Sequence, residues 1–516
     1  MSNLSTLLGS VWSRRRVFGI GAAALLLMIA FSGARTWLAN SRAWKRDLAA
    51  SGFVDEMIPP GRGERILVVA PHPDDETLGC GGLMQEAAAR GADVQVALVT
   101  NGDASELSVV FGERELPWSP QAFITLGRRR QDEALRAASS LGVPPSHVHF
   151  LGYPNNGLVA LWRPEHWPYT RLYRSPRTGV SLSPYARSLT RDAPYCGQQV
   201  LSDLITLLHQ VQPTAIFVTH PQDIHPDHWA TCAFVQYALA TIAARGAQWA
   251  RDATIYGYLV HWPSYPLPRR FSPRLPLLPP SELVGEHRQW LRLPLSPQVA
   301  RRKLLAIRSY HSQEPVFARL LLDFARANET FELLSPAHMP IGGAHEWSLP
   351  AGKRRALNGV QLARLRLAVP GKTLSAAVRK SPLPVQKNAY IALDIRAWDE
   401  HGAPVIATVY EDAGSKLHVV RLGWSPGTPV ARSPDRRGGP KGLAARVTTR
   451  ARVPGLPARH PDRDEVLIDP FPLPPGDLVR REFFVTCWGS VLDRVIDPGV
   501  MALVRLHSPG DYGADP

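Results

Sequence analysis

Two short motifs, far apart in the sequence, combine histidine with aspartate in patterns that suit a metal-dependent reaction. The first spans residues 71–76 (PHPDDE), and the second spans residues 220–228 (HPQDIHPDH). His72 and Asp75 stand three positions apart on a proline-containing turn, so both can face one ion while Asp74 stays free beside it. The second motif supplies a cluster of imidazoles. Two histidines and one carboxylate with open positions suit a catalytic Zn²⁺.

The reaction that such a site favours is hydrolysis of an amide. A bound Zn²⁺ lowers the pKa of water from about 15.7 toward about 7, and a free carboxylate beside it can accept the proton. The metal and a nearby imidazole can then stabilise the oxyanion that forms at the attacked carbonyl group. A non-haem iron oxygenase is an alternative, because it also uses two histidines and a carboxylate. Such an enzyme usually places these ligands on an antiparallel barrel, which the surrounding sequence does not predict.

The segments around the motifs alternate between strand-like and helix-like patterns. Residues 65–70 form a continuous apolar run that is typical of a buried parallel strand, and it ends just before the first motif. Further strands are expected at 94–100, 148–152 and 214–219, and helices at 83–90, 125–141 and 201–211. This alternation predicts an α/β fold with a doubly wound, mostly parallel sheet. Since ligands bind beyond the carboxyl ends of such strands, the sheet is expected to bring the motifs together.

With these motifs the sequence resembles the PIG-L/LmbE-like family of zinc-dependent N-acetylglucosamine deacetylases. The family shares the PHPDDE string and the later HPDH, and further similarity lies at 130–133 (RQDE), 151–154 (LGYP) and 310–313 (YHSQ). The resemblance extends over residues 60–340. It implies a Rossmann-like catalytic domain that removes an acetyl group from an N-acetylated amino sugar in a glycan or glycoconjugate.

The resemblance also implies roles for individual residues. The metal ligands that it implies are His72, Asp75 and His228. Asp74 is expected to act as the general base on the attacking water. His225 is expected to stabilise the oxyanion or protonate the leaving amine, oriented by Asp227.

Four further residues are candidate substrate contacts: Arg130, Asp103, Asn155 and Asn156. Arg130 can bind a phosphate or carboxylate of the substrate, or it can pair with Glu133 on the surface of a helix. Asp103 can line the pocket or cap a helix. Asn155 and Asn156 stand where many relatives carry an aspartate after the Tyr-Pro pair, so substrate contacts there are expected to differ.

Other notable residues have simpler explanations. His220 is expected to be an ordinary core or surface histidine. Residues 79–82 contain three glycines but lack the Lys-Ser/Thr of a phosphate loop, so a tight strand-to-helix turn is expected there. The segment 160–194 is rich in tryptophan and tyrosine, which either cover a pocket or pin the loop to the surface.

The net positive charge of the chain comes from its two ends. Of the formal net charge of +15 over 516 residues, residues 1–50 carry +6 and residues 350–516 carry +9, which leaves the middle neutral. Basic ends fit contact with an anionic membrane surface or an acidic glycan, or they serve only the solubility of the protein. The sequence has neither zinc-finger spacing nor a basic helix with heptads, so nucleic acid is not an expected partner. It does not indicate an oligomeric state.

An apolar stretch lies close to the N-terminus, at residues 17–31 and extendable to 34, after three arginines at 14–16. A membrane span needs roughly 20 apolar residues, whereas the core of a signal peptide needs roughly 7 to 15. Residues 17–34 are therefore expected to be a transmembrane anchor or an export signal. The protein is then membrane-anchored or exported, with a bacterial inner membrane or periplasm favoured and a cytoplasm-facing anchor as the alternative.

After residue 350 the pattern changes to alternating residues without long helices. A hairpin is expected from 390–398 and 405–410, with further strands at 417–422, 482–487 and 500–506. We expect a β-sandwich there. The chain thus divides into a basic N-terminus with the anchor (1–50), a catalytic domain (60–340) and a β-rich accessory domain (350–516). A glycan-binding or scaffold protein that has lost deacetylase activity is a further alternative, although every chemical residue is present.

Overall fold

The computed structural model describes residues 35–348 except 37, 51, 53, 114–118 and 286–287. Beyond them it describes residues 362–369, 373–380, 389–398, 404–412, 417–423, 465–472, 482–491 and 495–507. The apolar stretch at 17–34, predicted to be an anchor or export signal, lies outside these residues. Among the helices of the described part, none is both long and apolar enough to cross a membrane.

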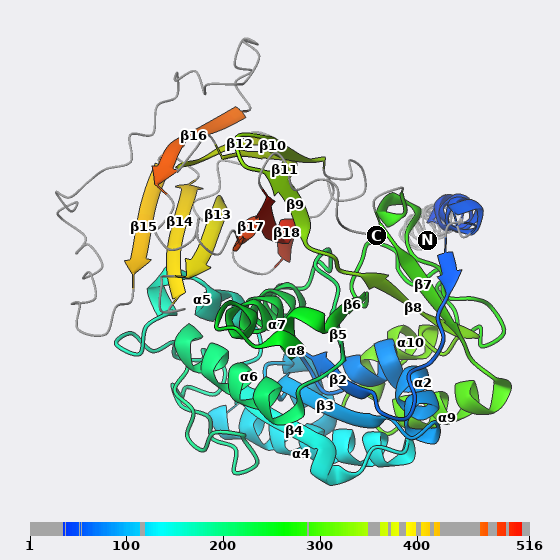
Figure 1. The fold of residues 1–516 in the computed structure, drawn as a ribbon. Coiled ribbons are helices and arrows are strands. Elements are labelled where there is room, and N and C mark those ends of the chain that lie inside the picture. Colours follow the sequence, from blue (N-terminus) through cyan, green and yellow to red (C-terminus); the bar gives the residue numbers. More distant parts are fainter. Residues whose placement is uncertain are drawn as a thin grey trace, which may run out of the picture.

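An eight-stranded, mostly parallel sheet forms the centre of the molecule, in the order β1-β7-β8-β6-β5-β2-β3-β4 (Figure 1). Its strands are β1 (Val54–Glu56), β2 (Arg65–Ala70), β3 (Asp93–Thr100), β4 (Val148–Tyr153), β5 (Ala215–Thr219), β6 (Thr254–Tyr258), β7 (Trp290–Pro294) and β8 (Asn328–Leu333). β2 to β6 pair in parallel, whereas β8 runs antiparallel to β6 and β7. The α/β fold with a mostly parallel sheet, predicted from the alternation, is confirmed.

Helices cover both faces of this sheet. They are α2 (Asp75–Ala89), α3 (Glu106–Ser108), α4 (Pro120–Ser140), α5 (Leu158–Trp162), α6 (Gly197–Val211), α7 (Pro226–Ala244), α8 (Gln248–Asp252), α9 (Pro297–Ile307) and α10 (Glu314–Asp323). Leu67 and Val69 of β2 share a buried cluster with residues of α6 and α7, whereas Ile66 and Val68 share one with α2, α4 and α9. Because both faces of β2 are buried after Arg65, the residues from Ile66 to Ala70 are all apolar rather than alternating.

The glycines at 79–82 lie inside α2, so the tight strand-to-helix turn expected there is wrong. α2 begins at Asp75, directly after the first motif. A Cβ atom at Gly79 would overlap the ring of Tyr258, and one at Gly82 would overlap the side chain of Leu295. The glycines therefore allow α2 to approach its neighbours closely, which an alanine at the same positions would prevent.

The C-terminal part contains two further sheets, mostly antiparallel. A four-stranded sheet has the order β10-β11-β12-β16, and a six-stranded sheet has the order β15-β14-β13-β17-β18-β9. Their strands are β9 (Ala337–Pro340), β10 (Ala344–Ser348), β11 (Leu362–Ala368), β12 (Thr373–Lys380), β13 (Ala389–Trp398), β14 (Pro404–Asp412), β15 (Leu417–Gly423), β16 (Glu465–Pro472), β17 (Glu482–Val491) and β18 (Val495–His507). The predicted hairpin is confirmed as β13 and β14. The sandwich arrangement and the domain boundaries stay predictions.

The six-stranded sheet packs on α7 through β17 and β18, and Figure 1 shows the sheet and the helix side by side. Trp398, Phe484 and Trp488 of this sheet belong to the same buried cluster as the apolar residues of α7. The guanidinium carbon of Arg396 (β13) lies 3.4 Å from the ring centroid of Trp162 and 4.3 Å from that of Trp167. Both tryptophans are buried, so these aromatic residues of the 160–194 segment pin it to the protein instead of covering a pocket.

Candidate metal centre

The two motifs meet at one edge of the central sheet. Residues 71–74 connect β2 to α2, and residues 220–225 connect β5 to α7. β2 and β5 are neighbouring parallel strands, so their carboxyl ends, and the motifs that follow, lie at the same edge. Asp74 closes the first turn with a φ of 133°, a value that favours glycine and is costly for aspartate. Backbone strain of this kind is found at functional sites, where it fixes the direction of a side chain.

The three predicted ligands lie together, with the two histidines on one carboxylate oxygen of Asp75. One carboxylate oxygen of Asp75 (Oδ2) lies 2.9 Å from His72 Nδ1 and 3.1 Å from His228 Nε2. All three side chains are buried. Burial opposes ionisation of Asp75, but the neighbouring imidazoles of His228 and His72 outweigh it and hold the pKa of Asp75 well below its usual value. A buried carboxylate that stays ionised between two histidines can hold a divalent cation.

His228 provides the test of whether a cation fits. Both of its ring nitrogens are buried without a hydrogen bond in the described part of the chain, although carboxylate oxygens of Asp75 and Asp223 lie 3.1 and 3.2 Å away. Despite its burial, these two carboxylates raise the pKa of His228 to about 10. A divalent cation at Nε2 would give this nitrogen a partner and would balance the excess of negative charge. The donor set therefore fits a metal.

Two more histidines lie beside this centre. His225 caps α7 and, with His72 and His228, forms a group whose candidate ligand atoms lie within 4.8 Å of one another. His261 forms a second such group with Asp75 and His228. His261 was not predicted from the sequence, because it stands alone three residues after β6 and comes near the motifs through the pairing of β6 with β5.

Asp223 was also missed, although it lies within the second motif. Its carboxylate is fully buried and accepts hydrogen bonds from the backbone amides of His225, Val260 and His261 at 3.0, 3.1 and 2.8 Å. The same carboxylate faces His228 Nδ1. A carboxylate behind a metal-binding histidine fixes the orientation of the ring and the nitrogen that is left for the metal. Asp223 is placed to do this for His228.

Asp74 lies beside the centre and contacts Arg130. Arg130 Nη2 donates to Asp74 Oδ2 at 3.2 Å, and the guanidinium also donates to the carbonyl oxygens of Pro73 and Gly102. Burial raises the pKa of Asp74 to about 7, while Arg130 opposes the rise. The expected alternative, an Arg130–Glu133 pair, does not form; Glu133 accepts hydrogen bonds from Ser312 instead. A carboxyl group with this pKa can both take up and release a proton near neutral pH.

Asp227 is linked to both motifs, but not as expected. Its carboxylate lies 3.2 Å from His72 Nε2 and accepts hydrogen bonds from the backbone amides of Asn156 and Leu158 at 2.6 and 3.1 Å. Only its backbone N–H reaches His225, donating to Nδ1 at 3.2 Å. Orientation of His225 therefore comes from the main chain at Asp227, and the carboxylate holds His72 in place.

The remaining candidate substrate contacts are largely engaged within the protein. Asp103 is buried and accepts hydrogen bonds from Asn155 N at 3.2 Å and from the Tyr185 hydroxyl at 2.6 Å. Asn155 keeps its buried side-chain oxygen without a hydrogen-bond partner among the described residues. Asn156 adopts a positive φ of 61°, which its short polar side chain tolerates. Asp103 thus fixes the loop at Asn155, whose side-chain oxygen stays without a partner among the described residues.

Comparison with known proteins agrees with this geometry. Residues 67–239 match the PIG-L family, described as GlcNAc-PI de-N-acetylase. The matched region begins in β2, ends in α7 and contains both motifs. The resemblance predicted from the motifs is confirmed over this region.

Similar proteins include deacetylases of Mycobacterium and Rhodococcus. The 1D-myo-inositol 2-acetamido-2-deoxy-alpha-D-glucopyranoside deacetylase of Mycobacterium sp. (strain KMS) is 30% identical over 201 residues, which are 39% of this chain and 54% of the relative. The enzyme of the same name from Rhodococcus opacus (strain B4) is 30% identical over 194 residues, 37% of this chain and 57% of the relative. The chain thus spans about half the length of these relatives. Among solved structures, N,N'-diacetylchitobiose deacetylase from Pyrococcus horikoshii has 19% identity and a TM-score of 0.31, over 52% of this chain and 84% of that one.

Proposed function

We propose that the protein is a zinc-dependent hydrolase that removes the acetyl group from an N-acetylated amino sugar. The observation that carries this proposal is the convergence of His72, Asp75 and His228 on one point beside Asp74. The match of residues 67–239 to the de-N-acetylase family and the activity named for the similar proteins support it.

His72, Asp75 and His228 would hold the metal. His225 and His261 are close enough to replace one ligand, whereas a carboxylate oxygen of Asp75 lies within 3.2 Å of nitrogens of both His72 and His228. Two histidines with one carboxylate is a ligand set known from catalytic zinc sites. When bound there, Zn²⁺ polarises a carbonyl oxygen and makes water more acidic.

Asp74 moves the proton in this proposal. Its carboxylate accepts a proton from the attacking water as the new C–O bond forms at the acetyl carbon. Because the pKa of Asp74 is raised to about 7, the acid form can then give this proton to the nitrogen of the leaving amine. The C–N bond breaks, and acetate and the free amino sugar are the products. Arg130 holds the carboxylate in position.

His225 stabilises the oxyanion as a neutral imidazole. Burial and the imidazoles of His72, His228 and His261 keep the pKa of His225 well below its usual value. Since Nδ1 accepts the N–H of Asp227, the proton of the neutral ring is on Nε2, which can donate to the oxyanion. The imidazolium form that would protonate the amine is disfavoured, which leaves that step to Asp74.

The proposal extends to the substrate class and the location of the enzyme. The acceptor is an N-acetylated sugar or glycoconjugate, as in the names of the similar proteins. Membrane association through residues 17–34, in a membrane-anchored or exported protein, is supported by the apolar sequence and the arginines before it.

The Asp74→Asn variant tests the proposal. It should retain one zinc per chain by elemental analysis while acetate release from N-acetylglucosamine conjugates falls by about 10²- to 10⁴-fold, the usual contribution of a general base. Asp132→Asn is the matched control, because Asp132 is half exposed on α4 and pairs with Arg187 at the surface. Full turnover in Asp74→Asn would remove Asp74 as the base, and wild-type protein that binds no metal would end the hydrolase proposal.

A further inference from the structure

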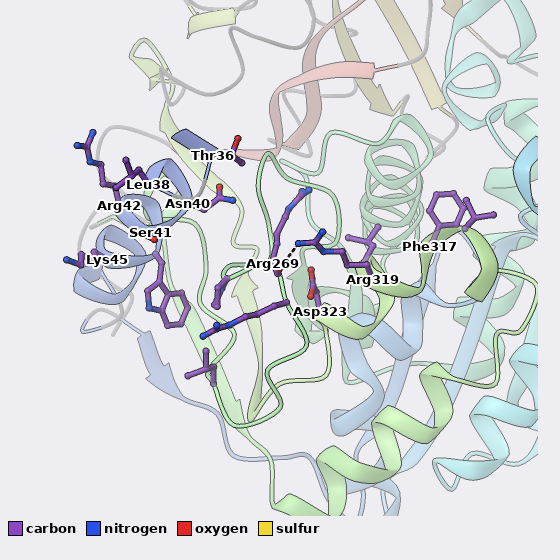
Figure 2. A pocket seen from close by; sticks show the side chains of 16 residues that line it. Thr36, Leu38, Asn40, Ser41, Arg42, Lys45, Arg269, Phe317, Arg319 and Asp323 are labelled. Carbon is purple, nitrogen blue, oxygen red and sulfur yellow. Dashed lines mark hydrogen bonds between the residues drawn. The ribbon is translucent and has the colours of Figure 1, made fainter. Parts of the chain in front are cut away.

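A large cavity lies away from the metal centre, between the helix at residues 38–50 and α10. Its volume is about 1320 Å³. Figure 2 shows side chains of the helix on one side, side chains of α10 on the other, and Arg269 between them. Asp47 fastens the helix to the body of the protein by accepting a hydrogen bond from Ser281 N at 2.9 Å. The cavity is therefore bounded by parts of the chain that are tied to one another.

Positive charge dominates the lining of this cavity. The basic lining residues are Arg42, Lys45, Arg269, Arg270 and Arg319, against one carboxylate, Asp323. Arg319 donates to the carbonyl oxygen of Arg269 at 3.1 Å, which fixes one guanidinium at the wall. Burial raises the pKa of Asp323 to about 6, so its negative charge is lost under mildly acidic conditions. The cavity is a place where an anion would be favoured.

Exposed apolar side chains surround the same place. Leu38 lines the cavity and is 47% exposed, and Phe317 of α10 lines it and is 36% exposed. Phe271, 49% exposed, follows the lining residues Arg269 and Arg270 directly. Phe111 is 59% exposed on a π-helical turn that contacts α10. Large apolar side chains among arginines are typical of surfaces that enter the interfacial layer of a membrane.

We propose that this face docks on a lipid bilayer that contains anionic lipids, with headgroup phosphates in the basic cavity and Leu38, Phe271 and Phe317 in the interfacial layer. The helix that carries Leu38 begins within a few residues of the apolar stretch 17–34. Insertion of this stretch into a bilayer would therefore bring the basic face to the membrane surface. The inference does not depend on the deacetylase activity, because it uses none of the residues of the metal centre.

A polarity-sensitive fluorophore on Phe271→Cys tests the docking in full-length protein reconstituted into liposomes. All four native cysteines are buried, so the new thiol is labelled selectively. Leu182→Cys is the matched control, because Leu182 is 45% exposed and lies on the segment beside β4. Emission is compared in phosphatidylcholine liposomes with and without phosphatidylglycerol, and in inorganic phosphate alone.

The probe at 271 should shift to the blue only in liposomes with phosphatidylglycerol, while the probe at 182 should not shift. Replacing Arg269 and Arg270 by glutamine should lower the ratio of docked to undocked protein by about 30-fold, since each basic residue near an anionic surface contributes about 1 kcal/mol. An equal shift in phosphatidylcholine, or a shift with phosphate alone, would overturn the proposal. So would an unshifted probe in protein that is fully incorporated into the liposomes.

Discussion

Replacing Arg396 tests whether the C-terminal strands and the α/β core form one cooperative structure. Arg396 is fully buried on β13, stacks on Trp162 and donates from Nη2 to the carbonyl oxygen of Trp162 at 2.6 Å. Asp394 on the same strand accepts a hydrogen bond from Trp162 Nε1 at 2.9 Å. Burial lowers the pKa of Arg396 to about 10, so the guanidinium is still charged at neutral pH.

The size of the effect follows from these contacts. A desolvated cation–π contact contributes about 2 kcal/mol, and a hydrogen bond from a charged group contributes about 1.5 to 3 kcal/mol. Nε and Nη1 of Arg396 have no hydrogen-bond partner among the described residues, so removing the side chain also relieves a desolvation cost. We therefore expect Arg396→Ala to lower the free energy of unfolding by about 3 kcal/mol. Arg396→Met, which keeps most of the side-chain volume and leaves a smaller cavity, should cost less.

The assay is denaturant unfolding of the full chain, followed by circular dichroism and tryptophan fluorescence. Arg364→Ala is the control, because Arg364 is about half exposed on β11 and forms a surface ion pair with Glu346 at 3.2 Å, which contributes at most about 1 kcal/mol. Equal stability of Arg396→Ala and Arg364→Ala would refute the reasoning. A separate, unchanged transition of the α/β core would refute it as well, because the core would then not depend on β13.

Two further variants examine the metal centre. Asp223→Asn should weaken zinc affinity by about 10- to 100-fold in a chelator competition assay, because the amide cannot orient His228 as the carboxylate does; unchanged affinity would exclude this role. Arg130→Met should move the acid limb of the pH profile of kcat/KM to higher pH, since Arg130 lowers the pKa of Asp74 and only ionised Asp74 is a base. If Arg130 instead binds substrate, KM should rise while the acid limb stays in place.

Much of the fold and the meeting of the two motifs could be predicted from the sequence. The strand expected at 65–70 is β2, and the one expected at 214–219 is β5 within one residue. Continuous apolar runs of this kind have few explanations besides a parallel strand covered on both faces. Once both strands are placed in one parallel sheet, the motifs that follow them must share an edge, so the meeting of His72 with His228 needed no further information.

What could not be predicted depends on strand order and on the direction of side chains. His261 reaches the centre because β6 lies next to β5, and the sequence after β6 shows only a lone histidine before a proline-rich segment. The carboxylate of Asp227 was expected at His225 but faces His72, because the turn before α7 determines the direction of each side chain. Spacing within a motif indicates which residues lie close together, but it does not show which of their atoms are in contact.

α7 connects the C-terminal sheet to the metal centre. Every residue from Pro226 to Ala244 is buried, whereas a helix covered on one side only would keep a polar stripe. The central sheet packs on one side of α7. The six-stranded sheet packs on the other side through residues such as Phe484 and Trp488. The same helix carries Asp227 and His228 in its first turn, so its packing determines where they lie. Truncation after residue 350 should therefore reduce acetate release from large and small substrates alike, and a selective loss on large substrates would instead assign the region to substrate binding.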